Sequence, residues 1–150
     1  MMDQRIVVGL PNANFNGMLR VYEWNINDSK WNQLGNDIMN TLNEHVGFSV
    51  SINADGTRIA SGNINPYKDY DSGILVRTGN TKIFHWDNEQ PHLGWVQLGN
   101  DIPGELLNDN QGYSVSLSGD GSIVAVGSNE LIIEEVKLLF IDGIILIGKI

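Results

Sequence analysis

The chain has no cysteine and little positive charge, and each shortage excludes classes of function. Without cysteine there is no disulfide, no thiol nucleophile and no cysteine-based zinc site. Nine lysines and arginines stand against 18 aspartates and glutamates, which gives a net charge of −9 and a pI near 4.5. Nucleic acids and anionic membrane surfaces select for basic patches, so the sequence predicts neither as a partner. The 150 residues are enough to bury one core.

What the chain does contain is an internal repeat. The octet WNQLGNDI at 31–38 returns as WVQLGNDI at 95–102. The segment GFSVSI at 47–52 returns as GYSVSL at 112–117, and an Asp-Gly pair follows each copy. VYEW returns as IFHW, and RIVVG has two later counterparts, RIASG and IVAVG. A period of about 50 to 65 residues is typical of arrays of β-blades.

Each repeat unit is expected to form short antiparallel strands. Residues 49–52 alternate serine with branched apolar residues, the pattern of a half-buried strand. The pairs Asp55-Gly56 and Asp120-Gly121 predict two-residue type I′ turns, which need positive φ at both positions. The other strands of the units are expected at 19–24, 31–35, 58–62, 82–86 and 95–99. Residues 37–45 leave room for one helical turn.

These motifs together resemble the repeat of FG-GAP-like β-propellers, which are related in layout to the head of the integrin α-subunit. The pattern that carries the resemblance is G-[FY]-S-V-S-[IL]-x-x-D-G-[ST]-x-[IV]-A-x-G, followed by [VI]-[YF]-x-W and W-x-Q-L-G-N-D-I. The resemblance implies an all-β fold of antiparallel four-stranded blades and a binding role, with no implied enzymatic activity. One complete blade is expected over 47–102, with partial blades over 5–38 and 112–127. Closed propellers have about four to eight blades, so residues 1–130 are expected to form an incomplete propeller.

Residues 131–150 leave this pattern and are rich in leucine and isoleucine. Charged side chains interrupt a segment that is barely long enough for a membrane helix, so no membrane span is expected. The Asp-Gly pair at 142–143, between apolar runs at 138–141 and 144–147, predicts a β-hairpin. Such a hairpin could replace the missing outer strands of the third blade. A shifted reading frame at the end of a truncated gene would produce a similar segment.

Two loops have part of the pattern of a calcium site. Asn12, Asn14 and Asn16 alternate before Gly17, which is the spacing of calcium-binding oxygens, but three neutral amides lack the charge that holds the ion. The corresponding loop of the next unit holds similar residues in a different register: Asp69, Asp71 and Gly73. Solvated turns are the favoured interpretation. Weak calcium binding in either loop, at 11–17 or 69–73, is the alternative.

The tryptophans form two pairs, Trp24 with Trp31 and Trp86 with Trp95, at equivalent places in the repeat. Packing between blades is favoured over a platform for sugars, because large aromatic side chains usually dominate core burial. The expected core is drawn from the apolar strand positions: Val50, Ile52, Ile59, Ile83, Phe84, Trp86, Trp95, Leu98, Val115, Leu117, Val124 and Val126.

No catalytic, cofactor-binding or metal-ligating residue is predicted. Ser49 and Ser114 lack the second glycine of a nucleophile elbow, and there is no phosphate-binding loop. Asp37 and Asp101 recur in the repeat and are expected to cap turns. The histidines show no paired spacing for a metal: His45, His85 and His92.

The leading functional hypothesis is a non-enzymatic binding or structural module whose loops meet a protein or glycan partner. It depends on the absence of any polar constellation that is not repeated. The alternatives are a fragment of a larger propeller enzyme and an architectural component of a surface layer or viral particle. Because an incomplete propeller leaves apolar blade faces and strand edges in water, we expect self-association or completion by another chain.

Overall fold

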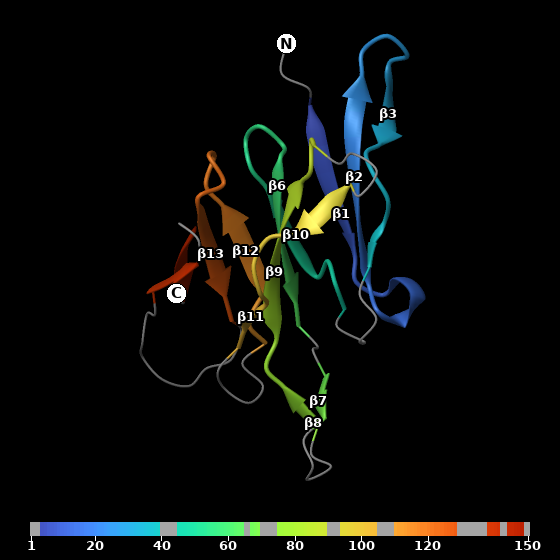
Figure 1. The fold of residues 1–150 in the computed structure, drawn as a ribbon. Coiled ribbons are helices and arrows are strands. Elements are labelled where there is room, and N and C mark those ends of the chain that lie inside the picture. Colours follow the sequence, from blue (N-terminus) through green and yellow to red (C-terminus); the bar gives the residue numbers. More distant parts are fainter. Residues whose placement is uncertain are drawn as a thin grey trace.

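The chain folds into short β-strands arranged in open sheets. The structure, a computed structural model, describes residues 4–39, 45–64, 67–69, 75–89, 94–104, 110–128, 138–141 and 144–148. Figure 1 shows an N-terminal sheet in blue, a central sheet in green and yellow, and a C-terminal sheet in orange and red. No sheet closes on itself, and the only helical element of the described residues is a short 3-10 turn, η1 (Ala13–Phe15). The expected all-β fold with antiparallel sheets is confirmed.

Sheet 1 is built around a long central strand, β2, which pairs antiparallel with β1, β3 and β4. Trp24 lies opposite Trp31 in the β2–β3 hairpin, as the sequence predicts. The helical turn expected at 37–45 is a strand at its start, and residues 40–44 lie outside the described residues. The strands of sheet 1 are β1 (Arg5–Leu10), β2 (Met18–Asn25), β3 (Lys30–Gln33) and β4 (Ile38–Met39).

Sheet 2 has the order β5-β6-β9-β10, with every pair antiparallel and β11 added beside β9. A separate hairpin, β7 (Tyr67–Asp69) with β8 (Leu75–Arg77), projects from the connection between β6 and β9 (Figure 1). The strands of sheet 2 are β5 (Ser49–Ile52), β6 (Arg58–Asn63), β9 (Asn80–Trp86), β10 (Trp95–Gln97) and β11 (Ile102–Pro103).

Sheet 3 has the order β12-β13-β15-β14. The hairpin predicted in the C-terminal segment is present, with Ile141 opposite Ile144. It joins β13 through β15, but that pair is parallel, whereas β9 runs antiparallel to β6 in sheet 2. The hairpin therefore extends the third sheet without reproducing the strand directions of the second. The strands are β12 (Ser114–Leu117), β13 (Ile123–Gly127), β14 (Leu138–Ile141) and β15 (Ile144–Gly148).

The predicted two-residue type I′ turns are wrong. Residues 53–57 connect β5 and β6, and within them Gly56 alone has a positive φ, of 70°. The reason is the side chain of Asn53, whose Oδ1 accepts hydrogen bonds from the amides of Thr57 and Arg58 and closes a wider loop. Asp55 then accepts from the Thr57 amide and hydroxyl, instead of standing at a left-handed position.

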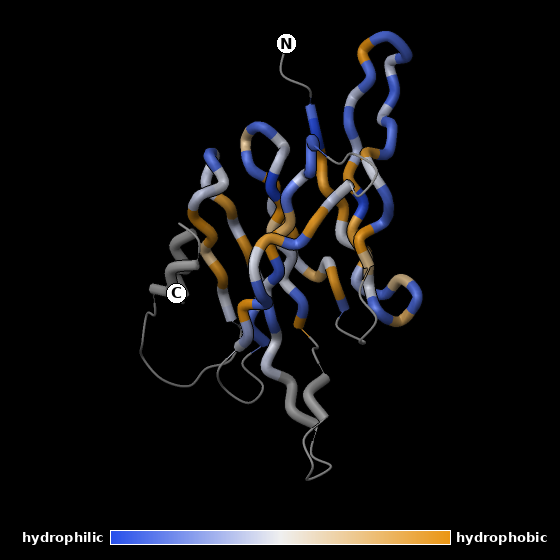
Figure 2. The backbone as a smooth tube through the Cα atoms, in the orientation of Figure 1, coloured by the Kyte–Doolittle hydropathy of each residue, from blue (hydrophilic) through white to orange (hydrophobic). Residues whose placement is uncertain are grey.

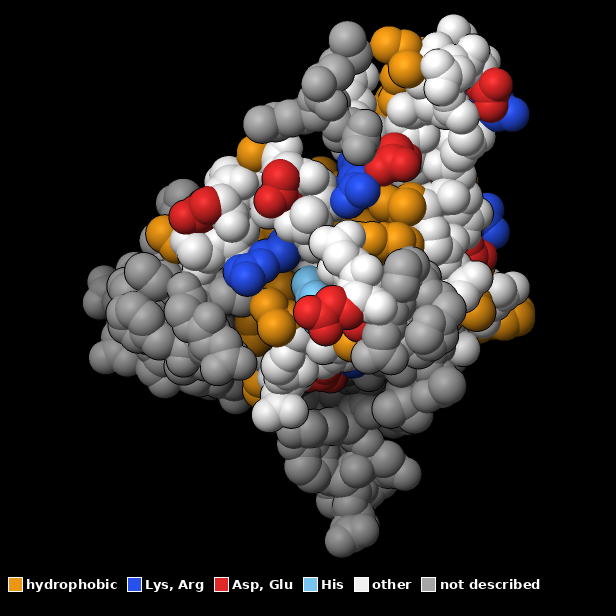
Figure 3. Space-filling model, turned by 45° about the horizontal axis from the view of Figure 1, so that its top comes forward, with side chains coloured by type: hydrophobic (Ala, Val, Ile, Leu, Met, Phe, Trp, Pro, Cys, Tyr) orange, Lys and Arg blue, Asp and Glu red, His pale blue; other side chains and the backbone are white. Residues whose placement is uncertain are grey.

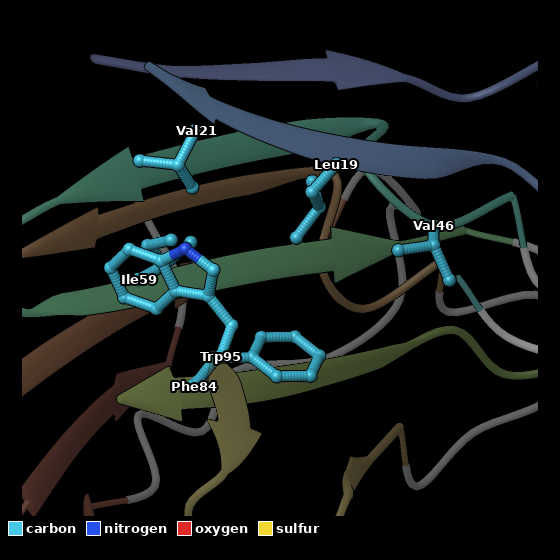
Figure 4. Close-up of a cluster of buried hydrophobic side chains, with 6 residues drawn as sticks. All are labelled: Leu19, Val21, Val46, Ile59, Phe84 and Trp95. Carbon is cyan, nitrogen blue, oxygen red and sulfur yellow. The ribbon is translucent and has the colours of Figure 1, made fainter. Parts of the chain in front are cut away.

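Two apolar clusters fill the contacts between the sheets. The first lies between sheets 1 and 2, and Figure 4 shows its side chains converging from both: Leu19, Val21, Val46, Ile59, Phe84 and Trp95. The second lies between sheets 2 and 3: Ala60, Ile83, Ile102, Val124 and Val126. Hydrophobic residues follow the strands and hydrophilic residues the loops, as Figure 2 shows. Burial between sheets therefore holds the three sheets together.

The predicted core agrees with these clusters, but it omits sheet 1. Six of the predicted residues are buried: Ile59, Ile83, Phe84, Trp95, Val124 and Val126. The others are partly buried and pack against a cluster: Val50, Ile52, Trp86, Leu98, Val115 and Leu117. Five buried cluster residues were missed: Leu19, Val21, Val46, Ala60 and Ile102.

Candidate functional site

The backbones of successive sheets are in close contact at the final glycine of the RIVVG-type segment. A Cβ built on Gly9 would lie 2.1 Å from the carbonyl oxygen of Gly47, and one on Gly62 would lie 1.9 Å from that of Gly112. Gly127 holds the same position in sheet 3, but its closest contact is the Ser114 Oγ at 2.4 Å. Glycine is thus required where one backbone rests on the next. Gly127 makes no such contact within the described residues.

In sheets 1 and 2, an arginine bridges the sheet to the turn of the next one. The Nη1 of Arg5 donates to the carbonyl of Gly56 at 3.3 Å, and the Nη1 of Arg58 donates to that of Gly121 at 3.0 Å. The corresponding residue of sheet 3 is Ile123. The contacts between sheets are therefore themselves repeated, and they have a direction along the chain.

Serine side chains supply a second link between sheets 2 and 3, from β5 to β12. The Ser49 hydroxyl donates to the carbonyl of Gly112 at 2.8 Å, and the Ser51 Oγ accepts from the amide of Leu117 at 2.9 Å. The alternation along β5 thus gives its two faces different contacts. Its apolar residues pack against the preceding sheet, and its serines bond to the following one.

The tryptophan pairs pack within their hairpins, and one of them also reaches across to another sheet. Ring centroids are 5.4 Å apart in both pairs, with edge-on geometry. Trp95 is 9% exposed, and its Nε1 donates to the Leu34 carbonyl of sheet 1 at 3.2 Å. Its counterpart Trp31 is 40% exposed. The expected packing between sheets is therefore observed for the second pair, whereas the first pair is partly open to water.

The exposure of Trp31 belongs to a wider pattern on one face of sheet 1. Alternation along the strands places three apolar side chains on this face, which we call the open face: Ile6, Val8 and Trp31. They are 40%, 38% and 40% exposed. Their counterparts in sheet 2 are 0%, 0% and 9% exposed: Ile59, Ser61 and Trp95.

The equivalent apolar residues of sheet 2 are buried because sheet 1 lies over them in the first apolar cluster. Ile59 and Trp95 are buried there because Leu19 and Val21 of sheet 1 lie over them. No described sheet lies over the open face of sheet 1 in the same way. The open face therefore has the composition of a buried contact between sheets and the exposure of a surface.

Inside sheet 2, a chain of polar side chains forms what we call the polar cluster. Ser61 donates to the Oδ1 of Asn63 at 2.8 Å, and the Nδ2 of Asn63 donates to the Oδ1 of Asn80 at 2.6 Å. The Nδ2 of Asn80 donates to the Oδ2 of Asp101 at 3.3 Å, and the Nζ of Lys82 forms an ion pair with the same oxygen at 2.8 Å. Its members other than Asp101 are buried, so their mutual hydrogen bonds offset the loss of water.

Part of the polar cluster is repeated, because the Lys82–Asp101 pair has a counterpart in Arg20–Asp37 of sheet 1. The Ser61–Asn63–Asn80 part has none, so the absence of an unrepeated polar constellation, expected from the sequence, is wrong for that part. Sheet 1 has apolar residues at three of its positions: Val8, Leu10 and Met18. The difference was detectable in the sequence as MLR at 18–20 against NTK at 80–82. The members of the cluster bond chiefly to one another, which indicates a structural role.

The contact between sheets 2 and 3 carries a further polar pair. Thr81 and Gln111 stand at the repeat positions of Leu19 and Val46, which are both buried in the first cluster. The Oγ1 of Thr81 and the Oε1 of Gln111 are buried and have no hydrogen-bond partner in the described part of the chain. The two contacts between sheets are thus alike in geometry and different in polarity.

The sequence predicts that Asp37 and Asp101 cap turns, but both instead bond to side chains. Asp37 accepts two hydrogen bonds from Arg20, at 2.7 and 2.9 Å, and one from the Nε2 of Gln33 at 2.9 Å. The hydrogen bond from Arg20 is the main reason that the pKa of Asp37 lies below its usual value. Asp101 accepts from Gln97 in the same way, at 2.8 Å. Both aspartates therefore tie the octet to the central strand of their sheet.

The loops with a partial calcium pattern show ordinary turn structure where they are described. Residues 13–15 form η1, and Gly17 follows with a φ of 77°. Asp69 ends β7, whereas Asp71 and Gly73 lie outside the described residues. In the described ranges, no group of three or more acidic or histidine side chains is placed to hold a metal ion. Weak calcium binding stays a prediction.

The histidines and the repeated serines are scattered across the fold. His85 lies on β9 opposite Arg58, His45 precedes Val46, and His92 falls outside the described residues. Ser49 bonds to a backbone carbonyl, and its counterpart Ser114 is exposed at the start of β12. Figure 3 shows basic side chains lying among acidic and apolar ones on one face of the molecule.

No family model and no curated protein matches the chain. The resemblance to FG-GAP-like propellers therefore stays a prediction from the sequence. Within the described ranges, no helix has both the length and the hydropathy needed to cross a bilayer.

Proposed function

We propose that the sheets are blades of an incomplete FG-GAP-like propeller, and that the chain is a non-enzymatic binding or structural module. Its binding surface is the open face of sheet 1, and its partner is a protein. The observation that carries this proposal is the contrast between equivalent positions, which are buried in sheet 2 and exposed in sheet 1. A surface with the composition of a contact between sheets is suited to a further sheet.

The energy available at the open face supports a protein partner. Ile6 and Val8 are already more than half buried, so covering the rest of each side chain is worth roughly 1 kcal/mol, and Trp31 adds a larger aromatic area. The open face also holds Arg20 and Gln33, but both already donate hydrogen bonds to Asp37. Its apolar side chains therefore favour a protein over a glycan, which would call for polar groups that are free to bond. A second copy of the chain or another blade-bearing protein meets this requirement. An enzyme is less well supported, because the polar cluster bonds to itself inside sheet 2.

The test is the assembly state of the chain at micromolar concentration. We expect the wild-type chain to self-associate in sedimentation velocity, and Val8→Asp to shift it toward monomer, because a carboxylate on the open face resists burial. The matched control is Ile26→Asp, which changes a residue that is 60% exposed in the turn between β2 and β3. Circular dichroism melts verify that both variants fold. A wild-type chain that is monomeric at every concentration, with no effect of Val8→Asp, would contradict the proposal.

A further inference from the structure

Strand β1 differs from its counterparts in having only one neighbour. In sheet 2, β6 lies between β5 and β9, and in sheet 3, β13 lies between β12 and β15. Among the described strands, β1 pairs with β2 alone. One edge of β1 is therefore open at the place where the other two sheets hold a strand of the type S-V-S-[IL].

Hydrogen bonds on the paired side identify the groups at the open edge. The carbonyl of Gln4 accepts from the amide of Trp24 at 2.9 Å, just as the carbonyl of Thr57 accepts from Trp86 at 2.9 Å. Backbone groups alternate between the two sides of an antiparallel strand. The N–H and C=O groups of three residues therefore point to the open edge: Arg5, Val7 and Gly9.

We propose that this edge accepts an extended segment of the type that β5 and β12 represent, with serine alternating with Val, Ile or Leu after a Gly-aromatic pair. The inference rests on the proposed function, because it names the partner's element at the same sheet. The pairing of β5 with β6 supplies the register: Ser49 lies opposite Gly62, and Ile52 lies opposite Ile59. By equivalence, the incoming segment places its first serine opposite Gly9 and its last apolar residue opposite Ile6.

In this register, both sets of side chains on the incoming strand find partners. Its valine and its isoleucine or leucine fall on the open face beside Val8 and Ile6, where cross-strand pairs add burial. Its serines turn toward β5, since Ser49 and Ser51 turn toward β12. The equivalent targets for these serines are the carbonyl of Gly47 and the amide of Ile52.

The surface that would receive the strand is already in place. Gly47 rests on Gly9 as Gly112 rests on Gly62, so sheets 1 and 2 have the same relative approach as sheets 2 and 3. Sheets 2 and 3 accommodate the equivalent strand, β5, with no change in that approach. Recognition is therefore by addition of a strand to a sheet edge, where the backbone gives affinity and the alternation gives specificity.

The first test uses peptides from this chain as probes. A labelled peptide of residues 47–54, GFSVSINA, is titrated with the full chain and followed by fluorescence anisotropy. The control, GFVSISNA, has the same composition, but its alternation is shifted by one residue, which moves every apolar side chain to the other face. We expect saturable binding of the first peptide and about tenfold or weaker affinity for the second, a difference of about 1.4 kcal/mol. Equal affinity for both peptides, or no binding of either, would overturn the proposal.

Hydrogen exchange locates the bound peptide. We expect slower exchange at the amides of Arg5, Val7 and Gly9, with little change at those of Ile6 and Val8, which already face β2. Protection elsewhere, or protection without alternation, would place the peptide at another surface and refute the strand register. If Val8→Asp abolishes self-association but the peptide does not bind, a whole sheet covers the open face and this inference fails. If the peptide binds with the alternating pattern to a monomeric chain, the inference stands and the self-association test fails.

Discussion

Replacing Gly62 with alanine tests whether the sheets are held at the distance of a bare backbone. The new Cβ would lie 1.9 Å from the carbonyl oxygen of Gly112, whereas ordinary contact begins at 3.4 Å. That oxygen belongs to the backbone and accepts the hydroxyl of Ser49, so it cannot turn aside at low cost. Gly62 does not have a positive φ, so the whole effect is steric. Relief therefore needs sheets 2 and 3 to move apart.

Three terms set the magnitude. Overpacking a close contact costs about 1–3 kcal/mol, and weakening the Ser49–Gly112 hydrogen bond costs about 1 kcal/mol. Alanine returns about 0.4–1 kcal/mol by restricting the unfolded chain. We expect Gly62→Ala to lower the free energy of unfolding by about 1–4 kcal/mol in total. The measurement is urea unfolding followed by tryptophan fluorescence.

The control is Gly127→Ala, at the same position of the repeat. A Cβ there would meet the Ser114 Oγ at 2.4 Å, but the nearest backbone atom is 3.9 Å away. Because Ser114 can rotate, we expect a change within about 1 kcal/mol of wild type. Equal losses for the two variants, or no loss from Gly62→Ala, would refute the argument that backbone contact between sheets makes glycine necessary.

Two further predictions concern charged groups. Lys82→Met removes the cation that pairs with Asp101, and because the Lys82 side chain is only 8% exposed, we expect a loss of about 1–3 kcal/mol in urea unfolding. Lys30→Met breaks the exposed pair with Asp28 and is expected to change stability by less than about 0.5 kcal/mol, so equal effects would contradict the reasoning. Hydrogen bonding by Ser118 lowers the pKa of Asp120 to about 2 from 3.8, so the ionised carboxylate stabilises the fold above pH 3.8, and this contribution is lost as the pH falls through about 2. Asp120→Asn should therefore lower the urea midpoint at neutral pH and match wild type near pH 2, whereas a gap that does not depend on pH would contradict this origin.

Strands and their pairing were predictable because their signals are local and repeated. The alternation at 49–52, with its second copy at 114–117, predicts β5 and β12 with little ambiguity. The geometry of the turn between β5 and β6 was not predictable, because it depends on the side chain of Asn53, which accepts hydrogen bonds from the amides of Thr57 and Arg58. A dipeptide rule considers only the two central residues of such a turn.

Side-chain contacts between residues far apart in the sequence could not be predicted from it. The pairing of Asp37 with Arg20 joins the octet to β2, and neither residue alone indicates the other. An exposed apolar face was expected in general, because an incomplete propeller would leave one uncovered. Its residues could be named only once the alternation of β1 and β3 was known. The polar cluster was missed because its members lie on several strands, although comparing Met18 with Asn80 would have marked it.

The unequal polarity of the two contacts between sheets has a consequence for how the chain avoids misfolding. Tandem modules of similar sequence can exchange equivalent segments while they fold, and trapped species result. If sheet 1 docked on sheet 3 in place of sheet 2, Leu19 would meet Gln111, and Val46 would lose the apolar cover that buries it. Fully burying a valine side chain is worth about 1.5–3 kcal/mol, and the contact of Leu19 with Gln111 does not replace that burial. The difference between the Leu19–Val46 and Thr81–Gln111 pairs thus favours the native order of the sheets over docking in the wrong order.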